Sequence, residues 1–220
     1  MSISIPGARL ISAEEARAVI EPVLKPHLNA KDLQYALDQE LCLDDPYDRR
    51  GVLELPDGTM IDGDLVLDFD AAEYEGKRYR GVVALGQLTI KGDILAENPD
   101  AGPFLAVCGE LGVRQIIKGG APVIVGGRLT AAELIFCFYN NHGRLRALGG
   151  LKARGLIVDD QKIDIKKPIE VQVKALKARA LADVLVPDLL SEDEKGKSVP
   201  MDDVSAEIIA RMKAGKPVLR

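Results

Sequence analysis

A short pattern of glycine and alternating apolar residues recurs along the middle of the chain. A leucine follows the glycine by two positions, and a small or branched apolar residue follows the leucine by two more. The copies are GDLVL at 63–67, GQLTI at 86–90, GELGV at 109–113, GRLTA at 127–131 and GGLKA at 149–153. Alternation with period two predicts strands with one buried face. Self-similarity at a spacing of about 20 residues predicts stacked coils.

A second apolar pair follows the glycine by seven and eight positions in three copies: Ile116-Ile117, Leu134-Ile135 and Leu156-Ile157. Equal offsets indicate that the same side chain returns to the same place on successive coils. A single coil cannot bury its own apolar face, so coils must stack at the strand spacing of roughly 4.7–4.9 Å. Glycine at each start suits a corner that needs a positive φ or a close backbone approach. We expect one inner column of Leu65, Leu88, Leu111, Leu129 and Leu151.

Two other repeat folds fit this pattern less well. Leucine-rich repeats need L-x-x-L-x-L-x-x-N, which does not occur in the sequence. A left-handed β-helix uses six-residue repeats with aliphatic corners, whereas here the period is unequal and glycine occupies the corners. The prediction is a mainly β protein, a right-handed parallel β-helix (solenoid) of about five coils with helical capping segments at both termini.

The flanking segments predict three regions. Residues 1–50 form a helical N-terminal cap, since Ser12 and Glu15 make a capping-box pattern before an apolar helical face. A second helix is expected over 31–41 and a linker over 44–50. Residues 51–168 form the solenoid. Residues 169–220 form a C-terminal strand and helical cap, with a mobile linker near 189–200 and a final helix after Asp202-Asp203. Such caps would cover the unpaired strand edges.

Composition limits the classes of partner and the cellular compartment that we expect for the protein. The net charge is −5, from 34 acidic and 29 basic residues, which argues against nucleic acid as a partner. Three cysteines without a C-x-x-C pair predict neither disulfides nor a zinc site, and fit a reducing cytoplasm. We expect no secretory signal, no membrane span, no metal and no cofactor. Aromatic residues make up 4% of the chain, too few for an aromatic sugar-binding platform.

The densest polar cluster is the proposed binding loop Tyr139, Asn140, Asn141 and His142. Aligning GRLTA with GGLKA places Cys137 over Asp159, so the loop is expected near Asp159 and Asp160. A histidine beside carboxylates suits proton transfer or metal binding. The alternative is a solvated turn, and one histidine falls short of a zinc ligand set. Cys108 and Cys137 flank apolar strands and are expected to be buried thiols.

The glycine-led phrases, together with YNNHG and GGLKARGLIVDD, resemble bacterial polymer-forming proteins of the bactofilin type. They also resemble uncharacterised β-solenoid proteins encoded near polymorphic-toxin genes, some of them immunity proteins. The resemblance covers about residues 60–165. It implies a β-helical fold that acts by binding or assembly, and it carries over no catalytic residue. The long flanking regions depart from bactofilins, whose tails are short, and argue against filaments.

Three functions follow as hypotheses. The first is a non-enzymatic solenoid that binds another protein, such as a basic toxin domain that it neutralises, because the chain is acidic overall. The second is a self-assembling structural protein. The third is a β-helix enzyme acting on carbohydrate through the residues of the YNNH loop and Asp159-Asp160. No catalytic residue is assigned under the first two.

Overall fold

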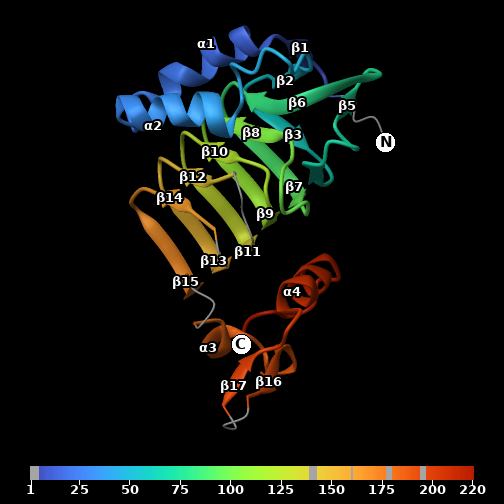
Figure 1. The fold of residues 1–220 in the computed structure, drawn as a ribbon, viewed down its shortest axis with the longest axis vertical. Helices are drawn as coiled ribbons and strands as arrows, with labels where there is room; N and C mark the ends of the chain where they lie inside the picture. The colour runs from blue at the N-terminus through green and yellow to red at the C-terminus, as the bar shows by residue number, and fades with distance from the viewer. Residues whose placement is uncertain (1–4, 139–142, 160, 177–179, 194–196) are drawn as a thin grey trace.

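The computed structural model describes residues 5–138, 143–159, 161–176, 180–193 and 197–220. The chain winds into a β-solenoid built from two facing sheets of mostly parallel strands (Figure 1). The strand order is β1-β2-β6-β8-β10-β12-β14 in the first sheet, where β5 also pairs with β6, and β15-β13-β11-β9-β7-β3 in the second sheet, where β4 also pairs with β7. The predicted mainly β solenoid is confirmed.

From β6 onward, each coil contributes one strand to each of the two sheets. The first sheet contains β1 (Arg9–Ile11), β2 (Gly51–Leu55), β5 (Glu73–Tyr74), β6 (Lys77–Ala84), β8 (Phe104–Val107), β10 (Val123–Val125), β12 (Leu145–Ala147) and β14 (Ile163–Ile165). The second contains β3 (Thr59–Ile61), β4 (Leu65–Val66), β7 (Leu88–Ala96), β9 (Leu111–Lys118), β11 (Leu129–Phe138), β13 (Leu151–Asp159) and β15 (Ile169–Ala175). Between the sheets lies a continuous apolar core.

The predicted inner leucine column forms, except at its first position. Leu88 lies opposite Leu111, and the column continues through Leu129 and Leu151 to Ile169. Leu65 does not belong to it, because Leu65 pairs with Ile94 and Thr59 takes the place opposite Leu88. The prediction was wrong here because the first and second halves of these long strands both alternate with period two. The glycine-led pattern therefore does not show whether Leu65 lies beside the first or the second half of β7.

Register shifts in the second sheet explain a second error. Between Ala131 and Leu134 the pairing of β11 with β13 shifts, so Ile135, not Leu134, lies opposite Leu156. Cys137 consequently lies opposite Val158 rather than Asp159. An irregularity of this kind bends a strand and changes which side chain faces inward. Counting equal offsets from the glycine cannot reveal it.

The glycine corners stack directly on one another. Gly127 donates its N–H to the carbonyl of Gly109 at 2.8 Å, and Gly149 donates to Gly127 at 2.9 Å. A Cβ atom added at Gly127 would lie 2.6 Å from the carbonyl oxygen of Gly109. Because φ is not positive at these positions, close approach between coils is the reason for glycine.

The N-terminal helices cover the outer face of the first sheet rather than the end of the solenoid (Figure 1). These are α1 (Ala13–Leu24), α2 (Ala30–Tyr35) and the π-helical turn η1 (Ala36–Glu40). The predicted capping box is present: Ser12 Oγ accepts from the Glu15 amide, and Glu15 accepts from the Ser12 amide. Ile20 and Leu24 are buried in one cluster with Val83 and Ile124 of the sheet. The segment also contains a strand that was not predicted, β1, antiparallel to β2.

A buried ion pair fixes the end of η1 on the sheet. Arg146 of β12 donates from Nε and Nη2 to the two carboxylate oxygens of Glu40, at 2.9 and 3.0 Å. Both side chains are almost fully buried, with exposed fractions of 1% and 0%. Arg144 and Asp164 extend the network towards solvent. A bidentate pair of this kind specifies one docking position for the helices.

The segment predicted to be a linker over 44–50 is held by a second ion cluster. Asp48 accepts from Arg50 at 2.7 and 2.9 Å, and Arg80 Nη2 lies 3.0 Å from the same carboxylate. Burial by itself raises the pKa of Asp48, but hydrogen bonds from Arg50 and the charge of Arg80 outweigh this effect and lower the pKa to about 2. The segment therefore joins α2 and η1 to the solenoid through a paired carboxylate.

The C-terminal segment packs against the outer face of the second sheet. It contains α3 (Leu181–Val184), the 3-10 turn η3 (Pro187–Leu189), the hairpin β16 (Leu190–Glu192) and β17 (Ser198–Pro200), and α4 (Val204–Lys213). Part of the predicted mobile linker is thus an antiparallel hairpin. The predicted final helix is present, although Asp203 at its N-cap makes no side-chain capping bond.

Candidate binding surface

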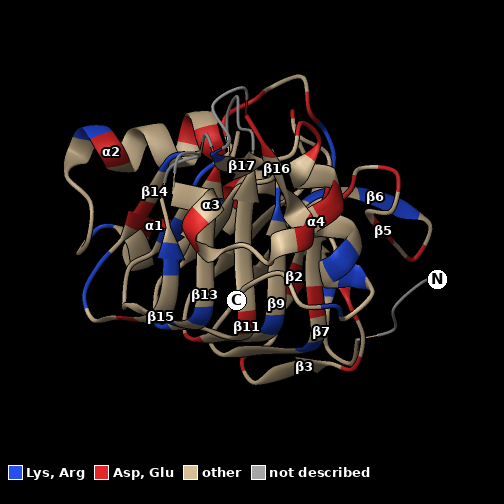
Figure 2. Cartoon of the chain, turned by 90° about the horizontal axis from the view of Figure 1, so that it is seen from below, with Lys and Arg blue, Asp and Glu red and all other residues tan. Residues whose placement is uncertain are grey.

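The outer face of the second sheet is divided into a covered and an uncovered half. Outward side chains near the C-terminal ends of the strands are apolar, and the C-terminal segment buries them: Ile117, Phe136, Phe138 and Ile157. Gly155 makes room for this packing, since an added Cβ would lie 2.4 Å from Leu219 Cδ1. Figure 2 shows the segment over one end of β7, β9, β11 and β13, with the other end uncovered.

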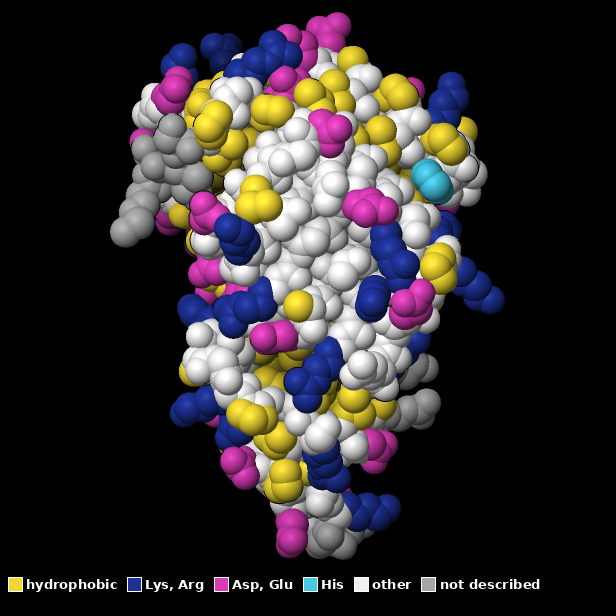
Figure 3. All heavy atoms as spheres, turned by 180° about the vertical axis from the view of Figure 1, so that it is seen from behind, with side chains coloured by type: hydrophobic (Ala, Val, Ile, Leu, Met, Phe, Trp, Pro, Cys, Tyr) yellow, Lys and Arg dark blue, Asp and Glu magenta, His cyan; other side chains and the backbone are white. Residues whose placement is uncertain are grey.

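The other half of the strands presents small and charged residues to solvent. We call this surface the uncovered face; it comprises Gly112, Arg114, Thr130, Ala132, Lys152, Arg154, Glu170 and Gln172. Neighbouring strands place Thr130 opposite Lys152, and Lys152 opposite Glu170. Because the central positions are small, the backbone of the sheet is accessible to a flat partner. On the side of the molecule opposite to that in Figure 1, backbone and small polar groups likewise cover the middle (Figure 3).

Charge on and around the uncovered face is partly neutralised within the chain. Arg114 Nη2 lies 2.7 Å from Asp93 Oδ2, and Arg128 Nη2 lies 2.7 Å from Glu170 Oε1. Lys152 and Arg154 are exposed, and no carboxylate of the described residues pairs with either. The face therefore offers two free cations beside small side chains.

A buried carboxylate lies at the boundary between the two halves. Asp93 is 2% exposed, and its Oδ2 accepts from Arg114 at 2.7 Å and from Gln115 Nε2 at 2.8 Å. Gln115 Nε2 also donates to the carbonyl of Met212 in α4, at 2.9 Å. Asp93 Oδ1 has no partner among the described residues. Through Gln115, this carboxylate connects the sheet to the end of α4.

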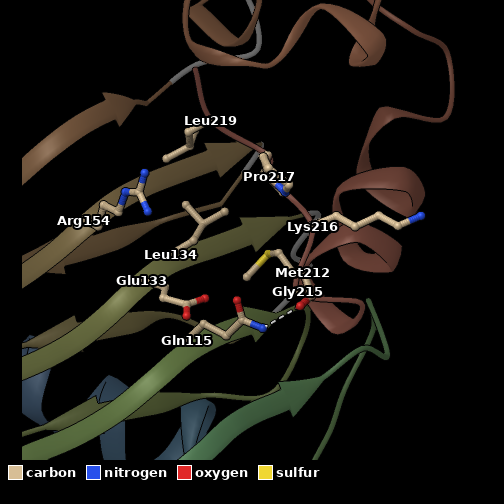
Figure 4. Close-up of a pocket in the computed structure, with 10 residues that line it drawn as sticks. Gln115, Glu133, Leu134, Arg154, Met212, Gly215, Lys216, Pro217 and Leu219 are labelled. Atoms are coloured by element: carbon tan, nitrogen blue, oxygen red, sulfur yellow. Dashed lines mark hydrogen bonds between the residues drawn. The ribbon is translucent and has the colours of Figure 1, made fainter.

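A small pocket opens beside this boundary, between the sheet and the C-terminal tail (Figure 4). Its volume is about 230 Å³, and Glu133, Leu134, Arg154, Met212 and Leu219 are among its lining residues. Lys216 also lines it, but its ammonium points away from the sheet (Figure 4). Sites for drug-sized ligands are roughly 300–1,000 Å³. The pocket is therefore smaller than the usual site for a drug-sized ligand.

Of the six residues that the sequence predicts for a binding site, only Asp159 can be placed. Tyr139, Asn140, Asn141, His142 and Asp160 lie outside the described residues. Asp159 is half-buried at the end of β13, and its Oδ2 accepts from Ser205 Oγ of α4 at 3.4 Å. Asp159 thus faces the C-terminal segment, a contact that the repeat alignment did not predict.

Sequence reasoning missed a buried lysine at the same corner of the solenoid. Lys118 has no exposed surface, and its ammonium donates to the carbonyls of Gly119 at 3.0 Å and Gly143 at 3.2 Å. Burial lowers the pKa of Lys118 to about 8. It lies opposite Cys137 in an inner column, and burial raises the pKa of that thiol to about 11. The sequence could have predicted this buried lysine, because Lys118 falls at an inward position of a strand with alternating apolar residues.

The remaining candidate groups are scattered. Cys108 is half-buried, burial raises the pKa of its thiol to about 11, and His27 is exposed in the N-terminal segment. Among the described residues no group of histidine, cysteine and acidic side chains is arranged to hold a metal ion. No helix in the described parts of the chain combines the length and apolarity needed to cross a membrane.

Comparison with known proteins returned no match at any level. No protein-family model matches the chain, no curated protein resembles it in sequence, and no solved structure resembles it in fold at the threshold of significance applied.

Proposed function

We propose that this protein is a non-enzymatic solenoid that binds another protein through the uncovered face. The observation that carries the proposal is the pair of exposed, unpaired cations Lys152 and Arg154 beside the small residues Thr130 and Ala132. A rigid sheet with small central side chains lets a partner approach its backbone closely. A rim of free charge then selects and orients that partner.

The charge near the uncovered face is a better guide to the partner's surface charge than the net charge of the whole chain. Electrostatic attraction is screened over about 8 Å at physiological ionic strength, so distant acidic residues contribute little at this face. Among the described residues, Arg114 and Arg128 at this face pair with Asp93 and Glu170, whereas Lys152 and Arg154 have no carboxylate partner. The docking region of the partner is therefore acidic. A toxin neutralised by this protein would be held through an acidic surface rather than a basic one.

The test is co-expression of the protein with the product of each neighbouring gene, followed by size-exclusion chromatography. We expect one product to co-elute with the wild type and to be lost from the Lys152→Glu/Arg154→Glu variant. The matched control is Lys25→Glu/Lys31→Glu, which makes the same charge change on exposed positions of the N-terminal segment. Equal retention by both variants would assign binding to another surface, and no complex with any product would contradict the proposal.

A further inference from the structure

The two ends of the solenoid differ in how the edge of the first sheet is protected. In the second sheet the edge strands β3, β4 and β15 each have one neighbouring strand among the described residues. At the first end, β1 pairs antiparallel with β2, and Tyr74 of the β5–β6 hairpin donates from its hydroxyl to the Ala8 carbonyl at 3.1 Å. Ile5 is buried there against the inner core. At the last end, β14 and β15 each have one neighbouring strand among the described residues. The last coil therefore presents an open edge.

The register identifies which backbone groups of β15 face outward. Leu151 lies opposite Ile169 and donates its N–H to the carbonyl of Pro168 at 2.9 Å. In a parallel pair this pattern directs the backbone groups of Glu170 towards β13. The N–H and C=O groups of Ile169 and Val171 then point away from the sheet. Arg154 and Gln172 do not pair, and the alternation reverses there, so the backbone groups of Val173 point towards β13. The outward groups of Ile169 and Val171 form a row of donors and acceptors that a further strand can use.

The side chains around this edge are partly apolar and strongly basic. Ile163, Ile165 and Val171 are only half-buried against the inner core, and Ile169 is 39% exposed. Lysines at positions 162, 166, 167 and 174 surround them and are all exposed. Among the described residues, only the lysine at 166 has an ion pair, with Asp164 at 3.0 Å. Lys167 precedes β15 and Lys174 lies near its C-terminal end. The two are seven residues apart, roughly 23 Å along an extended strand.

We propose that the open edge of β15 binds an extended acidic segment of a partner protein, which adds to the second sheet as a further strand. Backbone hydrogen bonds to Ile169 and Val171 supply the affinity. Acidic side chains at both ends of the added segment pair with Lys167 and Lys174. This inference rests on the proposed function, since the edge adjoins Lys152 and Arg154 of the uncovered face.

A second copy of this chain fits the edge less well. Two identical last ends would bring their lysines together, which is unfavourable. The first end is acidic, with seven acidic and two basic residues over 57–78. However, β1 and the β5–β6 hairpin already occupy that end, so a second solenoid cannot stack flat on it. A single extended segment meets neither obstacle.

The experiment uses the full chain and two capped synthetic peptides. One has a Val-Thr-Val-Thr centre with two glutamates at each end, and the other has lysines in place of the glutamates. Titration calorimetry at low salt should detect the acidic peptide only, with affinity falling as salt is added. In amide hydrogen exchange, the peptide should newly protect the amides of Ile169 and Val171.

Two variants test the two parts of the proposal. Val171→Pro removes an outward N–H without breaking a bond to β13, and should abolish peptide binding, whereas Val171→Thr should retain it. Lys167→Glu/Lys174→Glu should weaken binding about tenfold or more, and Lys25→Glu/Lys31→Glu should not. Circular dichroism verifies that each variant is folded.

Several results would overturn the inference: equal binding of both peptides, no binding of either, protection elsewhere in the chain, or concentration-dependent self-association that Val171→Pro abolishes. The last result would assign the edge to a second copy. If a neighbouring gene product still co-elutes with Val171→Pro, the inference fails while the proposed function stands.

Discussion

At the scale of single residues, the fold depends on positions where a side chain would displace the backbone of the next coil. Gly127 illustrates this, because an added Cβ would meet both the carbonyl oxygen and the carbonyl carbon of Gly109, at 2.6 and 2.7 Å. Neither atom can move without shifting the previous coil. The repeated glycine in the sequence thus marks the positions where successive coils are in backbone contact.

Gly127→Ala should therefore destabilise the protein by about 1–3 kcal/mol, the usual cost of overpacking. The matched control is Gly112→Ala on β9, where the nearest atom to an added Cβ is Thr89 Oγ1 at 3.9 Å. That change should stay within about 0.5 kcal/mol of the wild type. Urea unfolding measures both. Equal losses in the two variants would contradict the explanation by close approach.

Lys118 allows a second prediction at this scale. Its pKa in the folded protein is about 8, below the ordinary 10.5, so the unfolded chain binds more protons between these values. The contribution of Lys118 to stability should therefore rise with pH across this window, by about 1 kcal/mol between pH 8 and pH 9. The raised pKa values of Cys137 and Cys108 have the opposite effect in the same range, because an unfolded thiol titrates near about 8.5, so the effect of Lys118 is isolated by comparison with a variant.

The measurement is the free energy of unfolding at pH 8 and pH 9 for the wild type and for Lys118→Met. The difference between the two proteins should grow in favour of the wild type as the pH rises. Lys91→Met, at an exposed lysine paired with Asp62, serves as the control and should show no such trend. A constant difference for Lys118→Met would mean that its amine is not destabilised by burial.

At the scale of elements, local sequence patterns predicted which helices and strands form but not where these elements pack. The capping box at Ser12, the helix after Asp203 and the strands from Leu88 onward were all predictable, because each depends on residues close in sequence. The register shift after Ala131 was not, since it depends on how a strand bends over the core. The docking of η1 through Glu40 and Arg146 was not either, because these residues are 106 positions apart.

Glu40→Ala should cost about 3–5 kcal/mol, because it leaves the buried Arg146 guanidinium without its main partner. Replacing both residues, as Glu40→Met/Arg146→Leu, should recover most of that loss. The comparison pair is Lys213 and Glu97, which are 48% and 41% exposed, and Glu97→Ala should cost no more than about 1 kcal/mol. Denaturant unfolding of the four proteins gives the values. A double variant no more stable than Glu40→Ala would show that the pair is needed for more than charge compensation.

The candidate binding surface was the least predictable feature of the molecule. The YNNH loop stood out in sequence because its polar residues are contiguous. The uncovered face does not, since Thr130, Lys152 and Glu170 come together only through the pairing of three strands. Its extent also depends on the C-terminal segment, which buries one half of the sheet and leaves the other.

At the scale of the whole molecule, charge is segregated along the solenoid axis, from −5 over residues 57–78 to +6 over residues 144–179. The basic end coincides with the open strand edge. Lysines on an edge strand are a common means of preventing identical edges from pairing. We therefore expect the wild type to remain at its monomer mass of 23.7 kDa.

Neutralising the lysines at 162, 166, 167 and 174 to glutamine should remove that repulsion. Light scattering should then show a mass that rises with concentration towards twice the monomer value, while the corresponding arginine variant stays monomeric because it keeps the charge. High salt should also raise the mass measured for the wild type, since screening weakens repulsion between exposed charges. If the glutamine variant stayed monomeric, the backbone edge would be closed by some other means, and strand addition at β15 would lose its physical basis.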